Sequence, residues 1–238
     1  MLELWAPDGA LDRLERHLRA HGFLDPAADP SDQRIADVFL GYGLAATLRR
    51  AAEAWPPEPA RLPLVACQIR RRDEPPPAPG PFRVGRWEAT WDAARHMAAI
   101  DAAREAIAAG EIYQVNLVQH LSAPFVGDPG GLARRLAPLR PLHPRPMVGD
   151  GWAIASASPE LFLSRRGDVI TTMPIKGTRP SGGAADLRAS AKDAAEHVMI
   201  VDLERNDVGR VSVPGTVRWP ELMAPRSMAG VEHLVSRV

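Results

Sequence analysis

Apolar residues recur at helical spacing in several stretches of the chain. Leu11, Leu14 and Leu18 form one such face after Asp8, a typical N-cap residue, and Gly22 follows as a natural stop. Residues 35–55 and 130–139 predict two further helices. A third helix has the face Met97, Ile100, Ala103 and Ile107 and ends at Gly110. The longest covers residues 184–207, with the stripe Leu187, Ala191, Ala194, Val198 and Val201.

Shorter apolar runs predict strands. They cover residues 62–69, 112–121 and 152–158, and a hairpin joins 161–164 to 169–173 through a turn at 165–168. A second hairpin is predicted over residues 208–219, around Pro214-Gly215. The chain ends on an apolar segment, and residues 174–183 hold too much Gly and Pro to be regular. Hairpins interspersed with helices predict an α+β fold of antiparallel β-sheets flanked by helices.

Residues 70–81 divide the chain. Their sequence, RRRDEPPPAPGP, is charged and then proline-rich, which favours extended backbone and cannot build a core. We therefore expect a linker or a long surface loop there. Residues 1–69 form an N-terminal region to which the sequence assigns no role, and residues 82–238 carry all of the recognisable chemistry.

The charge balance and the cysteine content limit the class of protein. The chain has 29 basic and 29 acidic residues without an evident basic patch, so neither nucleic acid nor a membrane surface is expected as a partner. No apolar run approaches the length of a membrane-spanning helix. The first residues lack the basic start of a secretory signal, and the single cysteine cannot form an internal disulfide, so a cytoplasmic location is expected.

Four polar clusters could carry chemistry, and each also has a plainer interpretation. Glu160 could be a solvated carboxylate, and His233 a core histidine. Lys176 and Arg179, among glycines, could bind an anion or could form a solvated turn. Two acidic residues of the long helix share a face that suits Mg²⁺, although most such pairs only face solvent: Asp193 and Glu196. Spacing alone leaves the function open.

Together, five segments resemble the chorismate-utilising enzymes, the family of anthranilate synthase component I, aminodeoxychorismate synthase component I and isochorismate synthase. The resemblance runs from about residue 107 to residue 238. Its motifs are GEIYQVNL (110–117), SPELFL (158–163), PIKGTRP (174–180), EHVMIVDLERND (196–207) and HLVS (233–236). Glu111 stands where the family more often has Asp. The resemblance implies the chorismate-binding enzyme fold for residues 82–238.

The resemblance also implies a branch of the family. Aminodeoxychorismate synthases typically have lysine in the PI-x-GT loop and anthranilate synthases have alanine, and this chain has Lys176, one of its two lysines. The implied reaction is attack of the Lys176 amine on C2 of chorismate with loss of the C4 hydroxyl, followed by addition of ammonia at C4. Arginine could not do this, because it stays protonated. The plainer alternative is an ammonium that only holds a substrate carboxylate.

Other roles follow from the same resemblance. Glu160 is expected to protonate the departing hydroxyl, and His233 to contact the ring near C4. Gly177, Thr178 and Arg179 are expected to contact the substrate. Glu196, with Asp193 as a weaker second ligand, is expected to hold the Mg²⁺ that binds the ring carboxylate. Ammonia would come from a glutamine amidotransferase partner, and the product would be the precursor of p-aminobenzoate for folate.

The sequence stops directly after the HLVS motif, where family members continue into a segment with further metal and substrate ligands. We therefore expect a family member that is truncated at its C-terminus. Two alternatives remain at this point. One is anthranilate synthase component I, which needs no lysine nucleophile and eliminates pyruvate. The other is a non-catalytic module that binds an amidotransferase.

Overall fold

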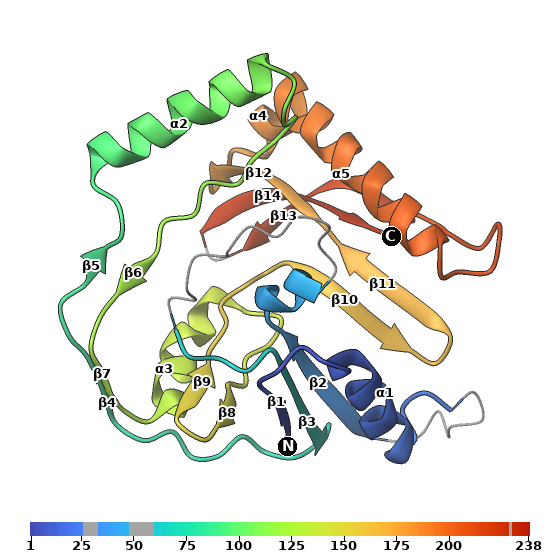
Figure 1. Ribbon diagram of the computed structural model, residues 1–238. Coiled ribbons are helices and arrows are strands. Elements are labelled where there is room, and N and C mark those ends of the chain that lie inside the picture. Colours follow the sequence, from blue (N-terminus) through green and yellow to red (C-terminus); the bar gives the residue numbers. More distant parts are fainter. Residues whose placement is uncertain (26–32, 48–59, 229) are drawn as a thin grey trace.

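The paired strands of the computed structural model are antiparallel throughout residues 1–25, 33–47, 60–228 and 230–238, which are the residues it describes (Figure 1). The helices are α1 (Ala10–Ala20), η1 (Tyr42–Thr47), α2 (Ala93–Ala108), α3 (Pro129–Leu136), η2 (Ala137–Leu139), α4 (Ala184–Ala189) and α5 (Ala191–Gly209). The strands are β1 (Leu2–Leu4), β2 (Arg34–Leu40), β3 (Val65–Arg71), β4 (Phe82–Val84), β5 (Glu88–Ala89), β6 (Leu121–Ser122), β7 (Phe125–Gly127), β8 (Met147–Gly149), β9 (Trp152–Ile154), β10 (Leu161–Arg166), β11 (Val169–Met173), β12 (Ile175–Pro180), β13 (Glu221–Met228) and β14 (Val231–Arg237). The predicted α+β class with antiparallel sheets is confirmed.

A small core lies between α1 and the sheet β1–β3–β2. Amphipathic α1 turns Leu14 and Leu18 of the predicted face to this sheet, whereas Leu11 is 52% exposed. Gly9, in a left-handed conformation, occupies the N-cap position that we expected Asp8 to fill. The buried residues of this core are Leu4, Ala10, Leu14, Val65 and Cys67.

The helix predicted over residues 35–55 is wrong in its first part. Residues 34–40 form β2, which pairs along its whole length with β3, and residues 42–47 form the short 3₁₀ helix η1. The rest of the prediction, residues 48–55, lies outside the described part. Cross-strand pairing decides this case, because Asp37 accepts a 2.6 Å hydrogen bond from Arg70 Nε on β3, and both side chains are largely buried.

The linker or loop was predicted over residues 70–81, but Arg70 and Arg71 belong to β3, and residues 72–81 contain neither helix nor strand. The end of this segment is held in place by a capping side chain. The Gly80 N–H donates to Asp128 Oδ2 at 2.6 Å, and the same oxygen accepts from the Gly131 N–H at the start of α3.

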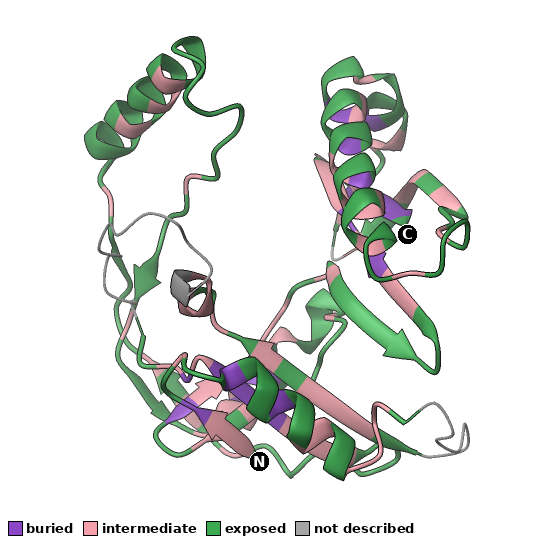
Figure 2. Cartoon of the chain, turned by 45° about the vertical axis from the view of Figure 1, so that its right-hand side comes forward, coloured by how far each residue is buried: buried purple, intermediate pink, exposed green. Residues whose placement is uncertain are grey.

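An arm built from β4–β7 and β5–β6 carries α2 at its tip (Figure 1). The α2 helix is confirmed, but it buries no residue in the described structure. The strand predicted over residues 112–121 is wrong except at Leu121, because residues 112–120 form no ladder with any described strand. Strand propensity alone does not make a strand without a partner. Figure 2 shows α2 at the end of the arm, away from α5.

The third part of the fold is the sheet β12–β14–β13, against which α4 and α5 pack. We predicted a loop over residues 174–183, and this prediction is wrong, because residues 175–180 form β12. A β-bulge accommodates the glycine. The register shifts between Lys176 and Thr178, and Gly177 adopts φ +73°. Figure 2 shows that buried residues gather in two places, around α1 and around α5.

The predicted long helix is two helices. Ser190 ends α4 and caps α5, where its hydroxyl accepts from the Asp193 N–H. Of the predicted apolar stripe, Leu187 and Val201 are buried. The rest of the stripe is wrong, since Val198 is 51% exposed. The sheet-facing positions of α5 are instead Asp193, His197 and Val201, which are buried.

Of the two predicted hairpins, one is confirmed and the other is wrong. The hairpin β10–β11 is confirmed, with its turn at Gly167-Asp168. The hairpin predicted over residues 208–219 is wrong, since a turn forms at Pro214-Gly215 without flanking strands.

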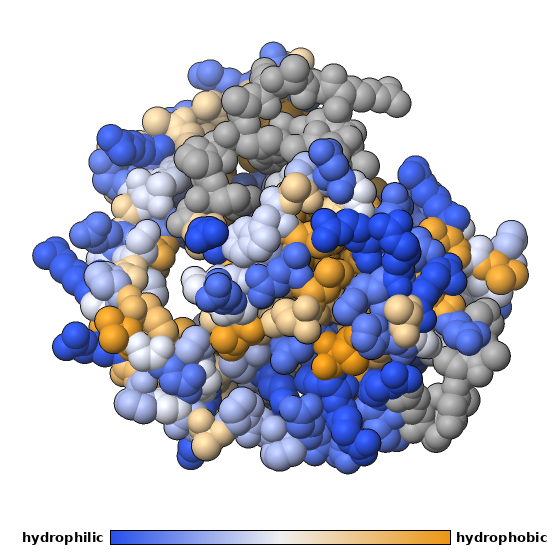
Figure 3. All heavy atoms as spheres, turned by 60° about the horizontal axis from the view of Figure 1, so that its bottom comes forward, coloured by the Kyte–Doolittle hydropathy of each residue, from blue (hydrophilic) through white to orange (hydrophobic). Residues whose placement is uncertain are grey.

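Among the described residues, no helix is both long and apolar enough to cross a bilayer. The face at the bottom of Figure 1 is mostly hydrophilic, with small separate apolar patches (Figure 3).

Two of the three leucines of α1 test the N-terminal core. We expect Leu14→Ala, at a position that is 8% exposed, to lower the free energy of unfolding by about 2–5 kcal/mol, because it leaves a cavity. Leu11→Ala, on the same helix but 52% exposed, is the matched control and should cost less than about 1 kcal/mol. Urea denaturation of both variants measures the difference. Equal losses would mean that α1 does not pack on the sheet as described.

Candidate active site

Pairing with β14, together with the bulge at Gly177, decides on which face of the sheet each residue of the PIKGTRP motif lies. Residues directly opposite each other in an antiparallel ladder share a face. Lys176 pairs with Leu234, and Thr178 pairs with His233. Because Leu234 and His233 are neighbours in β14, their side chains point to opposite faces. Lys176 and His233, which we predicted to share a site, therefore project from opposite faces of this sheet.

The Lys176 face is the one that α5 covers. Ser236 lies on this face, two residues from Leu234, and its hydroxyl lies 2.6 Å from Nε2 of His197 on α5. Arg179, opposite Glu232, lies on the same face and reaches α5 as well. Its pairing with Leu234 thus places Lys176 on the face of the sheet that α5 covers.

Glu160 is fixed beside Lys176. The Ile175 N–H donates to Glu160 Oε1 at 2.8 Å, and the Glu160 N–H donates to the Ser158 hydroxyl at 3.3 Å. The carboxylate thus lies next to the strand that carries Lys176, and its second oxygen makes no hydrogen bond or ion pair with the described residues. The structure brings together the predicted acid and the predicted amine.

His233 is oriented by backbone. Its Nδ1 lies 3.1 Å from the Gly177 carbonyl and 3.2 Å from the Thr178 hydroxyl. Because a carbonyl can only accept, Nδ1 must carry the hydrogen in this arrangement, and Nε2 of the neutral ring is left as an acceptor. Thr178 and His233 therefore form a pair on the face away from α5.

Arg179 and Asp193 neutralise each other. Arg179 Nη2 donates to Asp193 Oδ2 at 2.8 Å, and Asp193 is buried. A hydrogen bond from Ser190, and then the Arg179 guanidinium, hold the pKa of Asp193 below its usual range. The expected substrate contact of Arg179 and the expected metal contact of Asp193 would both require this pair to open.

Glu196 is the better placed of the two predicted metal ligands. Its side chain is half-exposed, and its one ion pair with the described residues is with the Lys192 ammonium at 3.7 Å. Mg²⁺ is commonly held by one or two carboxylates together with substrate oxygens, which Glu196 fits as a single ligand. No group of three or more His, Cys, Asp or Glu side chains converges within the described residues.

Sequence reasoning missed a buried polar link between α5 and the sheet. The Ser236 hydroxyl lies 2.6 Å from His197 Nε2 and accepts the Met223 N–H at 2.9 Å. Met223 has φ +51° at a bulge in β13, so this bond holds an unusual backbone conformation. Burial, and then the charge of Lys176, lower the pKa of His197. His197 lies four residues after Asp193 and so shares its face of the helix. This spacing was the signal in the sequence for its buried position.

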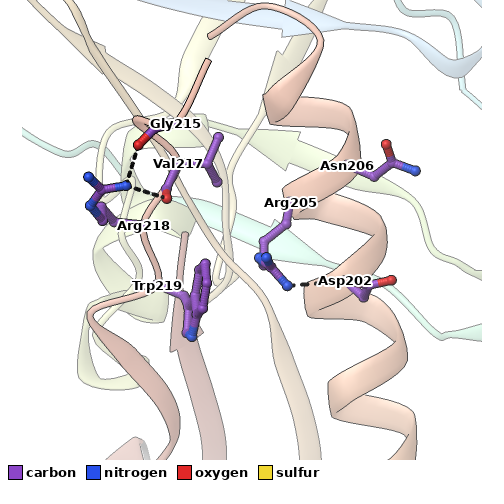
Figure 4. A pocket seen from close by; sticks show the side chains of 7 residues that line it. All are labelled: Asp202, Arg205, Asn206, Gly215, Val217, Arg218 and Trp219. Carbon is purple, nitrogen blue, oxygen red and sulfur yellow. Dashed lines mark hydrogen bonds and ion pairs between the residues drawn. The ribbon is translucent and has the colours of Figure 1, made fainter. Parts of the chain in front are cut away.

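A separate pocket of about 430 Å³ lies on another side of α5. Figure 4 shows Arg205 pointing from the helix toward Trp219, with the guanidinium 3.9 Å from the ring centroid. The lining contains none of the predicted site residues and consists of Asp202, Arg205, Asn206, Gly215, Val217, Arg218 and Trp219.

Known proteins resemble this chain over most of its length. The chorismate binding enzyme family matches residues 38–238. Anthranilate synthase component 1 of Streptomyces coelicolor is 36% identical over 229 residues, which cover 90% of this chain and 41% of that protein. Aminodeoxychorismate synthase component 1 of Salmonella typhimurium is 44% identical over 139 residues, which cover 54% of this chain and 30% of that protein. The chain therefore spans less than half the length of these two relatives.

A solved structure shares the fold. Anthranilate synthase component I from Streptococcus pneumoniae matches with a TM-score of 0.67 and 22% sequence identity, over 88% of this chain and 57% of that chain. At this identity the agreement concerns the fold alone.

Gly177 tests the bulge that aims Lys176. Its φ of +73° is strained for other residues, and an added Cβ would lie 2.8 Å from Cδ2 of the buried Leu187. Gly182 has a similar φ of +88° but open space around it, so Gly182→Ala is the matched control. We expect Gly182→Ala to lower the free energy of unfolding by about 1–2 kcal/mol, from strain alone. Gly177→Ala should cost about 1–3 kcal/mol more, from overpacking. Equal losses in urea denaturation would contradict the contact with Leu187.

Proposed function

The chain belongs to the chorismate binding enzyme family, and we propose that it carries the reacting amine of an aminodeoxychorismate synthase component I, with residues 82–238 as its catalytic domain. The observation that carries this proposal is Lys176, at the position of the PI-x-GT motif where the resemblance associates lysine with this branch. Its register with Leu234 aims it at the side of the sheet that α5 covers, and Glu160 lies beside it. An amine and a carboxylic acid are the two groups that the reaction requires.

Lys176 and Glu160 would divide the first step between them. The neutral amine forms a bond from Nζ to C2 of chorismate, the ring double bonds shift, and the C4–O bond breaks. Glu160 gives its proton to the departing hydroxyl, which leaves as water, because expulsion of hydroxide without an acid is prohibitive. Ammonia then forms a bond to C4, and the C2–Nζ bond breaks, which releases Lys176 and 4-amino-4-deoxychorismate.

Glu196 would hold the Mg²⁺ of this site. When bound, the ion would neutralise the ring carboxylate of chorismate. Asp193 could join it only after releasing Arg179, which in turn would be freed to contact a substrate carboxylate. With this exchange of partners, the predicted metal contact of Asp193 and the predicted substrate contact of Arg179 are compatible with the ion pair in the structure. Gly177 and Thr178, which precede Arg179 in the strand, would contact the same substrate.

His233 would reach the substrate only from the face away from α5. Its free Nε2 could accept a hydrogen bond from a substrate that extends around the edge of the sheet near Gly177. Ammonia would come from a glutamine amidotransferase, the partner that the resemblance implies.

Anthranilate synthase component I is the second candidate. The favouring observation is the relative from Streptomyces coelicolor, which aligns with 90% of this chain. In that reaction Lys176 would only pair with a substrate carboxylate. A non-catalytic module that docks an amidotransferase is a third possibility, and it predicts no chemistry at Lys176 at all.

The two lysines of the chain provide a direct test. We expect the chain, incubated with chorismate and Mg²⁺ without ammonia, to gain the mass of chorismate less one water on the peptide that contains Lys176. Lys176→Arg should abolish this adduct, because arginine keeps its proton. The control Lys192→Arg alters an exposed lysine and should leave the adduct unchanged.

Three other results would point elsewhere. Chorismate binding without an adduct, in a chain that forms anthranilate when ammonia is added, would favour the second candidate. Binding without any turnover would favour the docking module. An adduct on Lys192 would mean that the amine reacts because of its exposure and not because of the site.

A further inference from the structure

Two histidines at the end of α1 lie against each other and have no role in the proposed reaction. His17 is in the last turn of the helix, and His21 is its C-cap residue, four positions later. Residues at this spacing are neighbours on one face of a helix. The two rings are in contact, with 4.5 Å between their centroids and an angle of 50° between their planes.

The backbone at His21 is fixed by a Schellman motif. The Phe23 N–H donates to the Leu18 carbonyl at 3.0 Å, and the Gly22 N–H donates to the Arg19 carbonyl at 2.9 Å. Gly22 adopts φ +79°, the left-handed conformation that this motif requires. The end of the helix therefore holds His21 in a defined position relative to the preceding turn.

One ring nitrogen of His21 is already used, and this determines the role of the other. Nδ1 lies 2.8 Å from the backbone carbonyl of His17, and because a carbonyl can only accept, Nδ1 carries the hydrogen. Nε2 of the neutral ring then keeps its lone pair. Histidines that bind metals in proteins commonly have this arrangement, in which one nitrogen donates to a carbonyl and the other binds the ion.

The distance between the rings and the local charge also fit a bound cation. One ion that binds two ring nitrogens at about 2.0–2.1 Å places the ring centroids roughly 4.5–5.5 Å apart, and the centroids of His17 and His21 are 4.5 Å apart. The two rings lie at the C-terminal end of α1, where the helix dipole favours positive charge. Burial, and then the charge of His21, lower the pKa of His17, and a neutral ring is the form that binds a metal.

We propose that His17 and His21 together bind a divalent transition-metal ion such as Zn²⁺, with water completing its coordination. Imidazole suits Zn²⁺, Ni²⁺ and Cu²⁺, whereas Mg²⁺ prefers oxygen ligands, so this site differs in chemistry from the one proposed at Glu196. Nowhere in the described parts of the chain do three or more metal-binding side chains converge, and the site therefore has two protein ligands only.

A bound ion would cross-link the last turn of α1. Because α1 packs on the sheet β1–β3–β2, the ion would stabilise the folded N-terminal core. The site lies on a different helix from the candidate active site, which is built around β12 and α5 (Figure 1). The inference therefore does not depend on the proposed reaction.

Titration calorimetry of the untagged chain with ZnCl₂ tests the site. We expect one Zn²⁺ to bind per wild-type chain. His17→Gln and His21→Gln should each lower the affinity at least about tenfold, since even the groups that only orient a ligand contribute that much. The chain has seven histidines, and His96→Gln, on the exposed surface of the helix α2, is the matched control. It should bind Zn²⁺ as the wild type does.

A further variant separates geometry from the number of histidines. His21→Gln combined with Arg19→His keeps seven histidines but places the pair two residues apart, where they do not face each other on a helix. This variant should bind no better than His21→Gln. Zn²⁺ at 100 times its dissociation constant should also raise the Tm of the wild type by roughly 5–10 °C, because the ion binds the folded helix, and should leave the Tm of His17→Gln unchanged.

The proposal would be overturned if the wild type bound no Zn²⁺, or if both single variants on α1 bound it as well as the wild type. Binding that is lost equally in His96→Gln would also overturn it, since the ion would then be held elsewhere. Circular dichroism establishes that each variant folds. If His21→Gln does not fold, His21→Asn, which suits a helix end, provides the same comparison. None of these outcomes bears on the chorismate adduct at Lys176.

Discussion

The placement of the candidate site depends on how α5 is docked on the β12–β14–β13 sheet. Besides the Arg179–Asp193 ion pair, the docking contact is a buried hydrogen bond between His197 Nε2 and the Ser236 hydroxyl, 2.6 Å long. An apolar helix could rotate on a sheet with small loss of energy, but a buried polar atom that loses its partner costs about 1–3 kcal/mol. The bond therefore fixes the rotation of α5, and with it the side of the helix that faces the sheet surface carrying Lys176.

The sequence predicted well those elements whose stability is local. Amphipathic α1 and the β10–β11 hairpin formed as expected, since their signals come from neighbouring residues. Predictions failed where distant strands decide. Residues 34–40 became β2 because β3 supplies a partner, and residues 112–120 have no such partner in the described structure. Residues 175–180 read as a loop because Gly177 and the prolines are poor strand formers, yet the bulge gives the glycine a place.

The candidate site could be predicted only as a set of residue types. The motifs identified Lys176 and Glu160, and in the structure the Glu160 carboxylate accepts from the backbone N–H of Ile175, the residue before Lys176. They could not reveal that Lys176 pairs with Leu234, so that His233, the neighbouring residue of β14, lies on the other face, or that the bulge at Gly177 brings Thr178 to the face of His233. The partners of buried charges were equally hidden. Asp193 seemed a metal ligand by its spacing from Glu196, whereas its contact with Arg179 is a matter of tertiary structure.

The central claim, that a polar bond docks α5 and so aims the site, is tested most directly by a double-mutant cycle. The free energies of unfolding of His197→Ala, Ser236→Ala and the double variant are compared with that of the wild-type chain. We expect a coupling energy between about 0.5 and 3 kcal/mol, as for two buried side chains in contact. Losses that add to within about 0.3 kcal/mol would contradict the account, because they would mean that the two residues act independently.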